Sequence, residues 1–421
     1  MIAAPFGSHL SRPRGDVLSM KYLLASAAVL AVAGSACAQT ISLKPVAEGR
    51  LRYEHADQEG LPEEKADALT VRARAGLTAS SGALSATIVG QGTLALVDDY
   101  YDGVNGAATR PIVADPENIA LYIAQLQYKT KVLTLTSGRQ KIVLDDERFV
   151  GNVAFRDNGQ TFDAVRAEIT PAKGLKLDIA YAWSVRTIWG FQGKGVRQQA
   201  VSGDNILANL SYATPVGTLN GFAYLVDQDE AAVQAFRLSS QTYGVRLAGA
   251  QPLSKVAKFS YQFSYARQSD YHRNPNAYSA DYWLADGTLD MKGWKLNAGY
   301  EVLGASSGAP FTSFQTPLGT NFKFQGWADK FLTTPVNGIR DLYVGGGYGW
   351  KQLGPLSGVA LSASWHRFDS DRLDQHYGNE IDFLASARVK KMSLSIRYAH
   401  YDARAMATNT EKLWLQADWA I

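Results

Sequence analysis

Apolar and polar residues alternate with a period of two along most of this chain, in segments of about ten residues. Between Gly174 and Arg186, leucine, isoleucine, tyrosine and tryptophan take every second position, and lysine, aspartate, serine and arginine lie among the residues between them. Because the side chains of a strand point alternately to its two faces, this pattern predicts strands with one apolar and one polar face. Lys258–Ala266 and Gly293–Glu301 follow the same pattern.

The connections between these segments alternate in length. Short ones lie near Ser80–Gly82, Pro171–Gly174 and Lys390-Lys391, and long ones include His55–Ala68, Trp189–Asp204 and Leu303–Ile339. Outer-membrane barrels have short periplasmic turns and longer outer loops, whereas nothing makes the loops of a β-sandwich alternate over a whole chain. We therefore expect an all-β fold: a single transmembrane antiparallel β-barrel of about 18 strands, with long outer loops and short periplasmic turns.

The composition agrees with a barrel once the two faces are considered. The mean hydropathy is −0.16 and 46% of the residues are hydrophobic. A transmembrane barrel is polar on one face of every strand, so such average values are expected for it. After residue 40 the sequence has no run of about 18 apolar residues, which excludes a membrane protein built from helices. The apolar face is the predicted lipid face, and barrels of this size leave an aqueous channel.

The N-terminal residues predict export. Met20-Lys21 opens a basic region, Tyr22–Ala33 is apolar, and Ala36-Cys37-Ala38 is a small-residue cleavage site. We expect a signal peptide at 20–38, a barrel at 39–421, and at 1–19 an upstream extension from a mis-assigned start codon. Cys37 is a bystander or, on a sharper hypothesis, a lipid-anchor cysteine, although Gly34 stands where a lipobox has leucine. Removing residues 1–38 lowers the formal charge from +3 to +1, which argues against a nucleic-acid binder.

The polar face of the predicted strands carries many arginines. Arg50, Arg52, Arg72 and Arg74 belong to two neighbouring strands, and a ring of guanidinium groups would favour the passage of anions. Alternatively, they pair with Glu380, Asp382 and Asp418, which approach when the barrel closes. Both interpretations stay open. Alternation also directs Arg166, Arg246, Arg388 and Arg397 into the lumen.

Two polar stretches predict functional loops. Gly138–Arg166 carries Arg139, Arg148 and Arg156, and Arg139 is in phase with residues that face lipid unless it lies at the rim or Gly138 allows a bulge. Phe314–Tyr343 is too polar and too rich in turn-forming residues for a core helix, so we expect a large loop inside or over the barrel. The charged residues of this loop are Lys323, Asp329, Lys330, Arg340 and Asp341.

The same stretches resemble the alginate export family of outer-membrane barrels. The resemblance covers residues 48 to 421 and rests on GRQKIVLDDERFVG, NGQTFDAVR, FQTPLG and FQGWADKFLTTPVNGIRDLY, with RLRYEHAD and ALTVRARAGL near the start. It implies an 18-stranded monomeric porin that passes a polyuronate outward through an arginine-rich constriction gated by long loops. The matching positions are Arg52, Arg74, Arg139, Arg148, Arg156, Arg166, Asp329, Lys330 and Arg340.

Features of an enzyme are absent from the sequence. It has no G-x-S-x-G and no H-E-x-x-H, and its histidines show no ligand spacing. Asp98-Asp99 with Asp102, and Asp145–Glu147, could bind Ca²⁺, although plain acidic loops are the simpler explanation. The sequence thus predicts an outer-membrane porin for anionic saccharides such as alginate, with no cofactor. Its expected partners are outer-membrane lipid, an anionic oligo- or polysaccharide and periplasmic export partners. The alternatives are a general small-solute porin and a barrel-type outer-membrane enzyme.

Overall fold

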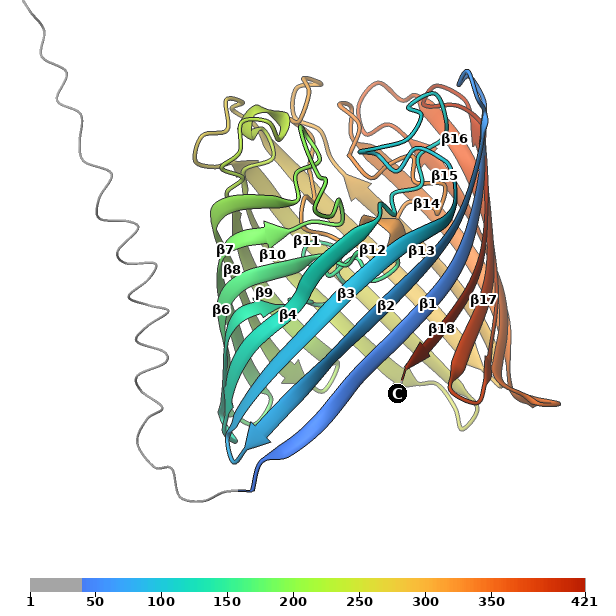
Figure 1. Ribbon diagram of the computed structural model, residues 1–421. Coiled ribbons are helices and arrows are strands. Elements are labelled where there is room, and N and C mark those ends of the chain that lie inside the picture. Colours follow the sequence, from blue (N-terminus) through green and yellow to red (C-terminus); the bar gives the residue numbers. More distant parts are fainter. Residues whose placement is uncertain (1–39, 421) are drawn as a thin grey trace, which may run out of the picture. The chain divides into compact units, whose positions relative to one another are not determined.

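A computed structural model describes residues 40–420, and the predicted extension at 1–19 and signal peptide at 20–38 lie outside these residues. The described chain forms one closed sheet of eighteen strands, in which every neighbouring pair is antiparallel (Figure 1). No helix among these residues is long and apolar enough to cross a membrane. The predicted fold class is confirmed.

The strands follow one another around the sheet in chain order. The first nine are β1 Ser42–Gln58, β2 Lys65–Ser81, β3 Leu84–Asp99, β4 Asn118–Lys129, β5 Leu133–Gln140, β6 Thr161–Ala172, β7 Leu175–Arg186, β8 Ala200–Thr214 and β9 Gly217–Val226. The others are β10 Ser240–Pro252, β11 Ala257–Asp270, β12 Ser279–Met291, β13 Trp294–Leu303, β14 Ile339–Leu353, β15 Leu356–Asp369, β16 His376–Val389, β17 Met392–Ala403 and β18 Thr410–Ala420.

The sheet closes where β1 pairs with β18. Their register runs from Glu48 opposite Ala420 to Gln58 opposite Thr410, so the first and last strands lie side by side (Figure 1). This closure leaves the sheet without an open edge, as a lipid environment requires. It also places Asp418 opposite Arg50 and Gln416 opposite Arg52.

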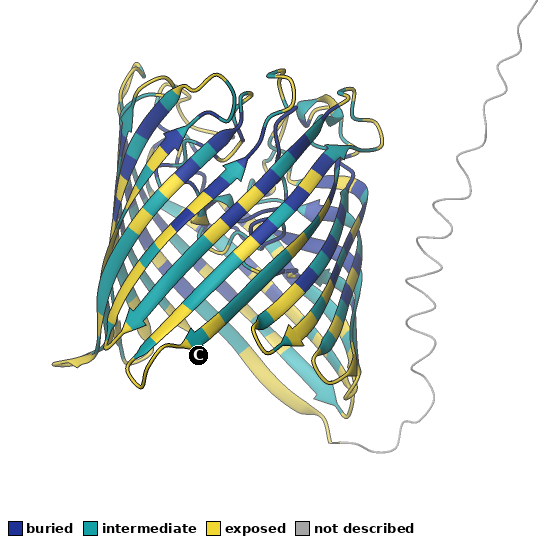
Figure 2. Ribbon diagram, turned by 180° about the vertical axis from the view of Figure 1, so that it is seen from behind, coloured by how far each residue is buried: buried dark blue, intermediate teal, exposed yellow. Residues whose placement is uncertain are grey.

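The period-two pattern sorts residues between the two faces of the wall. Figure 2 shows buried and exposed residues alternating along the strands. Large apolar side chains such as Tyr212, Trp283, Trp294 and Leu361 are exposed on the outside, which agrees with the predicted lipid face. Residues between them point into the lumen, where loops bury many of them.

The two rims of the barrel differ as predicted (Figure 1). One rim carries eight turns of two to four residues, and the other carries loops of six to 35 residues. The longest loop spans 304–338, so most of the predicted polar stretch is indeed a loop. Its last residues, Ile339–Tyr343, belong to β14, because Asp341 and Tyr343 already alternate with the exposed Leu342 and Val344.

Candidate functional site

Two long loops bind to each other through their backbones. We name them the β5–β6 loop (141–160) and the β13–β14 loop (304–338). The Gly151 amide donates to the Leu318 carbonyl at 2.9 Å, and the Thr320 amide donates to the Glu147 carbonyl at 2.9 Å. The rings of Phe155 and Phe322 stack with their centroids 3.4 Å apart. Since both loops also contact inward side chains of the wall, together they narrow the lumen.

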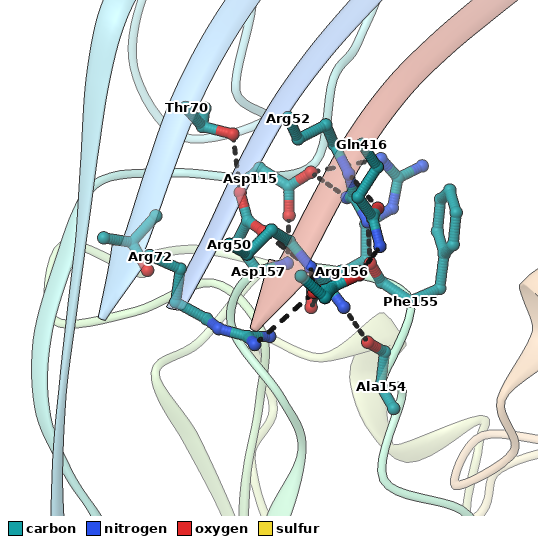
Figure 3. Close-up of polar contacts among 12 residues, drawn as sticks. Arg50, Arg52, Thr70, Arg72, Asp115, Ala154, Phe155, Arg156, Asp157 and Gln416 are labelled. Carbon is teal, nitrogen blue, oxygen red and sulfur yellow. Dashed lines mark hydrogen bonds and ion pairs between the residues drawn. The ribbon is translucent and has the colours of Figure 1, made fainter. Parts of the chain in front are cut away.

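The structure brings the four arginines of β1 and β2 together, as the sequence predicted. Arg50 lies opposite Arg72 in the register of β1 and β2, and all four side chains are buried. Arg50 donates to Asp418 at 2.7 Å. It also donates to the carbonyl oxygens of Ala154 and Phe155 in the β5–β6 loop (Figure 3). The β5–β6 loop therefore covers these arginines and is fastened to the wall by them.

Arg52 and Arg156 share a buried carboxylate, Asp115 of the β3–β4 loop (Figure 3). Asp115 lies 2.9 Å from Arg52 and 3.5 Å from Arg156, and it accepts the Asp157 amide at 2.6 Å. Burial alone would raise the pKa of Asp115, but Arg52 and Arg156 lower it below its ordinary value. An ionised Asp115 therefore connects the β3–β4 loop, to which it belongs, and the β5–β6 loop to Arg52 of β1.

Arg156 joins a third loop to this network. Its guanidinium lies 3.1 Å from Glu54 of β1 and 2.5 Å from Asp329 of the β13–β14 loop. Asp329 also accepts from Lys412 of β18 at 2.9 Å. Burial opposes ionisation of Asp329, but Lys412 and Arg156 lower its pKa. Arg156 and Asp329, both predicted site residues, thus connect the two lumen loops beside β1 and β18.

Arg72 and Arg74 differ in how well they are paired. Arg74 donates to Gln91 at 2.7 Å and lies 3.4 Å from Glu48, with its guanidinium 3.8 Å from the centre of the Tyr122 ring. Arg72 has only distant carboxylates, Glu48 and Asp418, each at 3.9 Å. Its buried Nε has no hydrogen-bond acceptor among the described residues.

Most of the other predicted arginines are held in ion pairs. Arg148 of the β5–β6 loop is buried and binds Glu301 of β13 at 2.7 Å. Arg166 binds Asp178 at 2.6 Å on the wall. Arg246 lies 3.6 Å from Asp145 and also donates to Gln262 at 2.8 Å. Arg139, next to Gly138 (φ 106°) at the end of β5, binds Asp163 at 2.7 Å.

Three sequence predictions need correction. Arg340 does not line the lumen: it is in phase with the exposed Leu342 and Val344 and binds Asp374 at 2.9 Å on the outer side. Glu380 and Asp382, predicted partners of the β1 and β2 arginines, form no ion pair with them. Glu380 instead accepts the backbone amides of Trp327 and Ala328, and Asp382 lies 3.8 Å from His366. Of the three predicted acids, Asp418 alone pairs with this cluster.

A few lumen cations keep no close carboxylate. The side chain of Arg397 in β17 makes no hydrogen bond or ion pair within residues 40–420, and its guanidinium lies 4.9 Å from the Trp327 ring. Lys141, at the start of the β5–β6 loop, is likewise without an ion pair there. Burial and the nearby Arg74 lower the pKa of Lys141. Arg388 is exposed near the short-turn end of β16 and also lacks a partner in the described chain.

The wall formed by β13–β15 carries small side chains. Gly345 and Gly347 face Asn297 and Lys295 in the register, and Ser364 and Ser362 face the same glycines from the other side. All of these residues except Gly345 line an open cavity of about 610 Å³, which also reaches Trp327, Asp382 and Asp290. We call this part of the barrel the small-residue wall, and the part formed by β1, β2 and β18, which carries Arg50, Arg52, Arg72 and Arg74, the arginine wall. The small-residue wall leaves space in the lumen, whereas loops fill the lumen beside the arginine wall.

Sequence reasoning missed the residues that hold the loops. Asp115, Asp157, Phe155, Phe322 and Trp327 lie in irregular segments, where period two gives no direction for a side chain. The run Gly345–Gly347 was a usable signal, because a strand without side chains there has room beside it. Within residues 40–420, no group of three or more histidine, cysteine, aspartate or glutamate residues could hold a metal ion.

The chain was compared with known proteins. No family model and no curated protein matches its sequence. Among solved structures, Acinetobacter baumannii OccAB3 superposes with a TM-score of 0.67 at 14% identity, covering 90% of this chain and 100% of that one. OccAB4 of the same organism gives 0.68 at 13% identity over 91% and 99%. Pseudomonas aeruginosa OpdK, solved with vanillate, gives 0.65 at 12% identity over 90% and 98%.

These similar structures are outer-membrane porins with eighteen-stranded barrels. The chain has their fold. At such low identity the likeness extends to the fold alone, and none of these comparisons supports the resemblance to the alginate export family.

Proposed function

We propose that this protein is an outer-membrane channel for small solutes that prefers anions. The observation that carries this proposal is the set of lumen cations without close carboxylates: Arg397, Lys141 and the weakly paired Arg72. Fixed positive charge beside a narrow aqueous path raises the local concentration of anions. The similar porin structures support an outer-membrane location and a channel rather than an enzyme.

The path is expected to run along the β13–β15 wall. The cavity of about 610 Å³ there is bounded by Trp327, whose ring also lies against Arg397. A solute in the cavity would therefore meet hydroxyl, amide and glycine surfaces, the charged side chains of Lys295, Asp290 and Asp382, and a guanidinium near Trp327. Such a surface suits small polar solutes, and Arg397 adds the preference for anions.

Transport of alginate or another polyuronate is a narrower form of the same proposal. It draws support from the motif resemblance and from the number of lumen arginines, most of which are paired in this structure. A general small-solute porin needs no further specificity and fits the lumen equally well. Block of the current by uronate oligomers at micromolar concentration would favour the narrower form.

The test is a reversal-potential measurement on purified protein in planar bilayers under a KCl gradient. We expect a potential of the sign that marks chloride as the more permeant ion. Arg397→Gln should reduce the permeability ratio by about half, because this guanidinium has no carboxylate to neutralise it. Arg166→Gln, which removes a paired arginine, is the matched control and should change the ratio less. Absence of conductance, or a preference for potassium, would reject the proposal.

A further inference from the structure

The short-turn rim of the barrel carries unpaired positive charge. The eight turns contain no aspartate or glutamate, and five of them contain lysine. All of these turn lysines are exposed, and none forms an ion pair within the described chain. They are Lys131, Lys173, Lys255, Lys292, Lys390 and Lys391.

Strand ends next to these turns add cations inside the mouth. Lys129 faces Thr134 in the register, in phase with the buried Thr136, so it points inward. Lys258 faces Asp290, which lines the cavity, and Arg388 lies in phase with the inward Asp382. The acids of this region are already engaged: Glu168 with Lys176 at 2.8 Å, and Asp290 with Lys295 at 4.0 Å.

The long-loop rim has a different balance. Its exposed acids include Glu64, Asp98, Asp99 and Glu117, and several of its bases are paired with acids. Examples are Arg110 with Glu63 at 2.6 Å and Arg404 with Asp402 at 2.8 Å. The two mouths of the barrel therefore present different charge to the compartments they face.

We propose that the short-turn mouth is an electrostatic vestibule, which gathers anions so that anion current entering there exceeds anion current entering through the long loops. The inference rests on the proposed anion channel and adds a direction to it. Charges at a mouth act on the local concentration of permeant ions over about one Debye length, which is about 10 Å at 0.1 M salt and about 3 Å at 1 M. The asymmetry should therefore be large in dilute salt and vanish in concentrated salt.

The test compares currents at opposite voltages in symmetric KCl. At 0.1 M, chloride driven in from the short-turn side should carry about 1.5 to 2 times the current of the reverse direction, and at 1 M the ratio should approach 1. A variant with the six turn lysines changed to glutamine should lose most of the asymmetry at 0.1 M. The matched variant with the six lysines changed to arginine keeps the charge and should keep the asymmetry.

A second measurement needs no variant. An amine-acetylating reagent added to one compartment neutralises the lysines on that side of inserted wild-type channels. It should abolish the current asymmetry when it is added to the short-turn side and not when it is added to the long-loop side. The inference fails if an anion-selective channel shows equal currents in both directions, or if the glutamine variant keeps the wild-type asymmetry. A cation-selective reversal potential instead rejects the proposed function and the vestibule with it.

Discussion

The arginine wall and the small-residue wall face the same lumen but use it in opposite ways. On β1, β2 and β18, buried guanidinium groups bind loop carbonyls and loop carboxylates, and the space is filled. On β13–β15, glycines and serines leave a cavity of about 610 Å³. A cluster of arginines in a barrel is therefore not by itself the ion path, because a loop with matching acceptors can occupy it. The solute is expected to pass where side chains are small.

Arg156→Met should have the largest effect, because it removes the cation shared by Glu54, Asp115 and Asp329. Breaking a buried ion pair by deleting one partner costs about 3–5 kcal/mol. With Asp329 released from the β5–β6 loop, we expect the two loops to loosen and single-channel conductance to rise by about twofold or more. The measurements are conductance in bilayers and the temperature at which the folded band is lost on a gel.

Arg340→Met is the matched control for this change. Among residues 40–420 the Arg340 side chain has one ion-pair partner, Asp374, which is almost fully exposed, so the loss of stability should be at most about 1 kcal/mol with unchanged conductance. If Arg156→Met kept wild-type conductance and heat stability, the loops would be held in place by other contacts, such as the stacked Phe155 and Phe322.

Ser362→Tyr tests the small-residue wall. The exposed Ser362 faces Gly347 across β14 and β15 and lines the cavity, so a large ring there should reduce conductance by about half or more. Folding should be unaffected because the side chain enters open space. Val344→Tyr places the same ring on the outer face of β14, away from the cavity, and should leave conductance unchanged. Equal conductance in the two variants would place the path elsewhere in the lumen.

Arg72→Gln and Arg74→Gln separate pairing from selectivity within the arginine wall. Arg74 loses a hydrogen bond to Gln91, the proximity of Glu48 and a ring contact with Tyr122, so its loss should cost about 1–3 kcal/mol. Arg72, with carboxylates no nearer than 3.9 Å, should contribute less to stability and more to anion preference. Heat stability and reversal potential are measured for both variants. If Arg72→Gln lost more heat stability than Arg74→Gln, the 3.9 Å separations would not reflect weaker pairing of Arg72.

Much of the fold could be predicted because period-two alternation is a local signal. It placed Arg50, Arg52, Arg72 and Arg74 on one face, and the order of strands made them neighbours. Arg340 is the exception, because its expected place in the pore rests on the motif resemblance, whereas its phase with the exposed Leu342 and Val344 directs it outward. The same phase rule predicted the inward direction of Arg397.

The sequence could not predict which loops fill the lumen or which arginines they cover. Asp115 and Asp157 reach the β1 and β2 arginines through irregular loops, and no periodicity encodes where such loops travel. For this reason the sequence alone does not decide between an anion path and ion pairs with the wall. The contacts answer it in part: Arg50, Arg52 and Arg74 are paired with the wall and the loops, and Arg72 is paired weakly.

The smallest expected effect concerns Lys330, in the β13–β14 loop beside the arginine wall. Burial, followed by the charge of Lys412, lowers the pKa of Lys330 from 10.5 to about 8. Since this folded value lies below the unfolded one, the unfolded chain binds more protons between about pH 8 and pH 10, and stability rises with pH through that window. Raising the pH from 7 to 9 also removes one lumen charge, so the chloride-to-potassium permeability ratio should fall slightly, by about a tenth to a fifth.

Lys330→Gln keeps a polar side chain near Gln58, with which Lys330 shares a 3.1 Å hydrogen bond, and it should remove this difference between pH 7 and pH 9. Arginines stay charged throughout this range, so an equal pH response in wild type and Lys330→Gln would assign the titration to another lumen group.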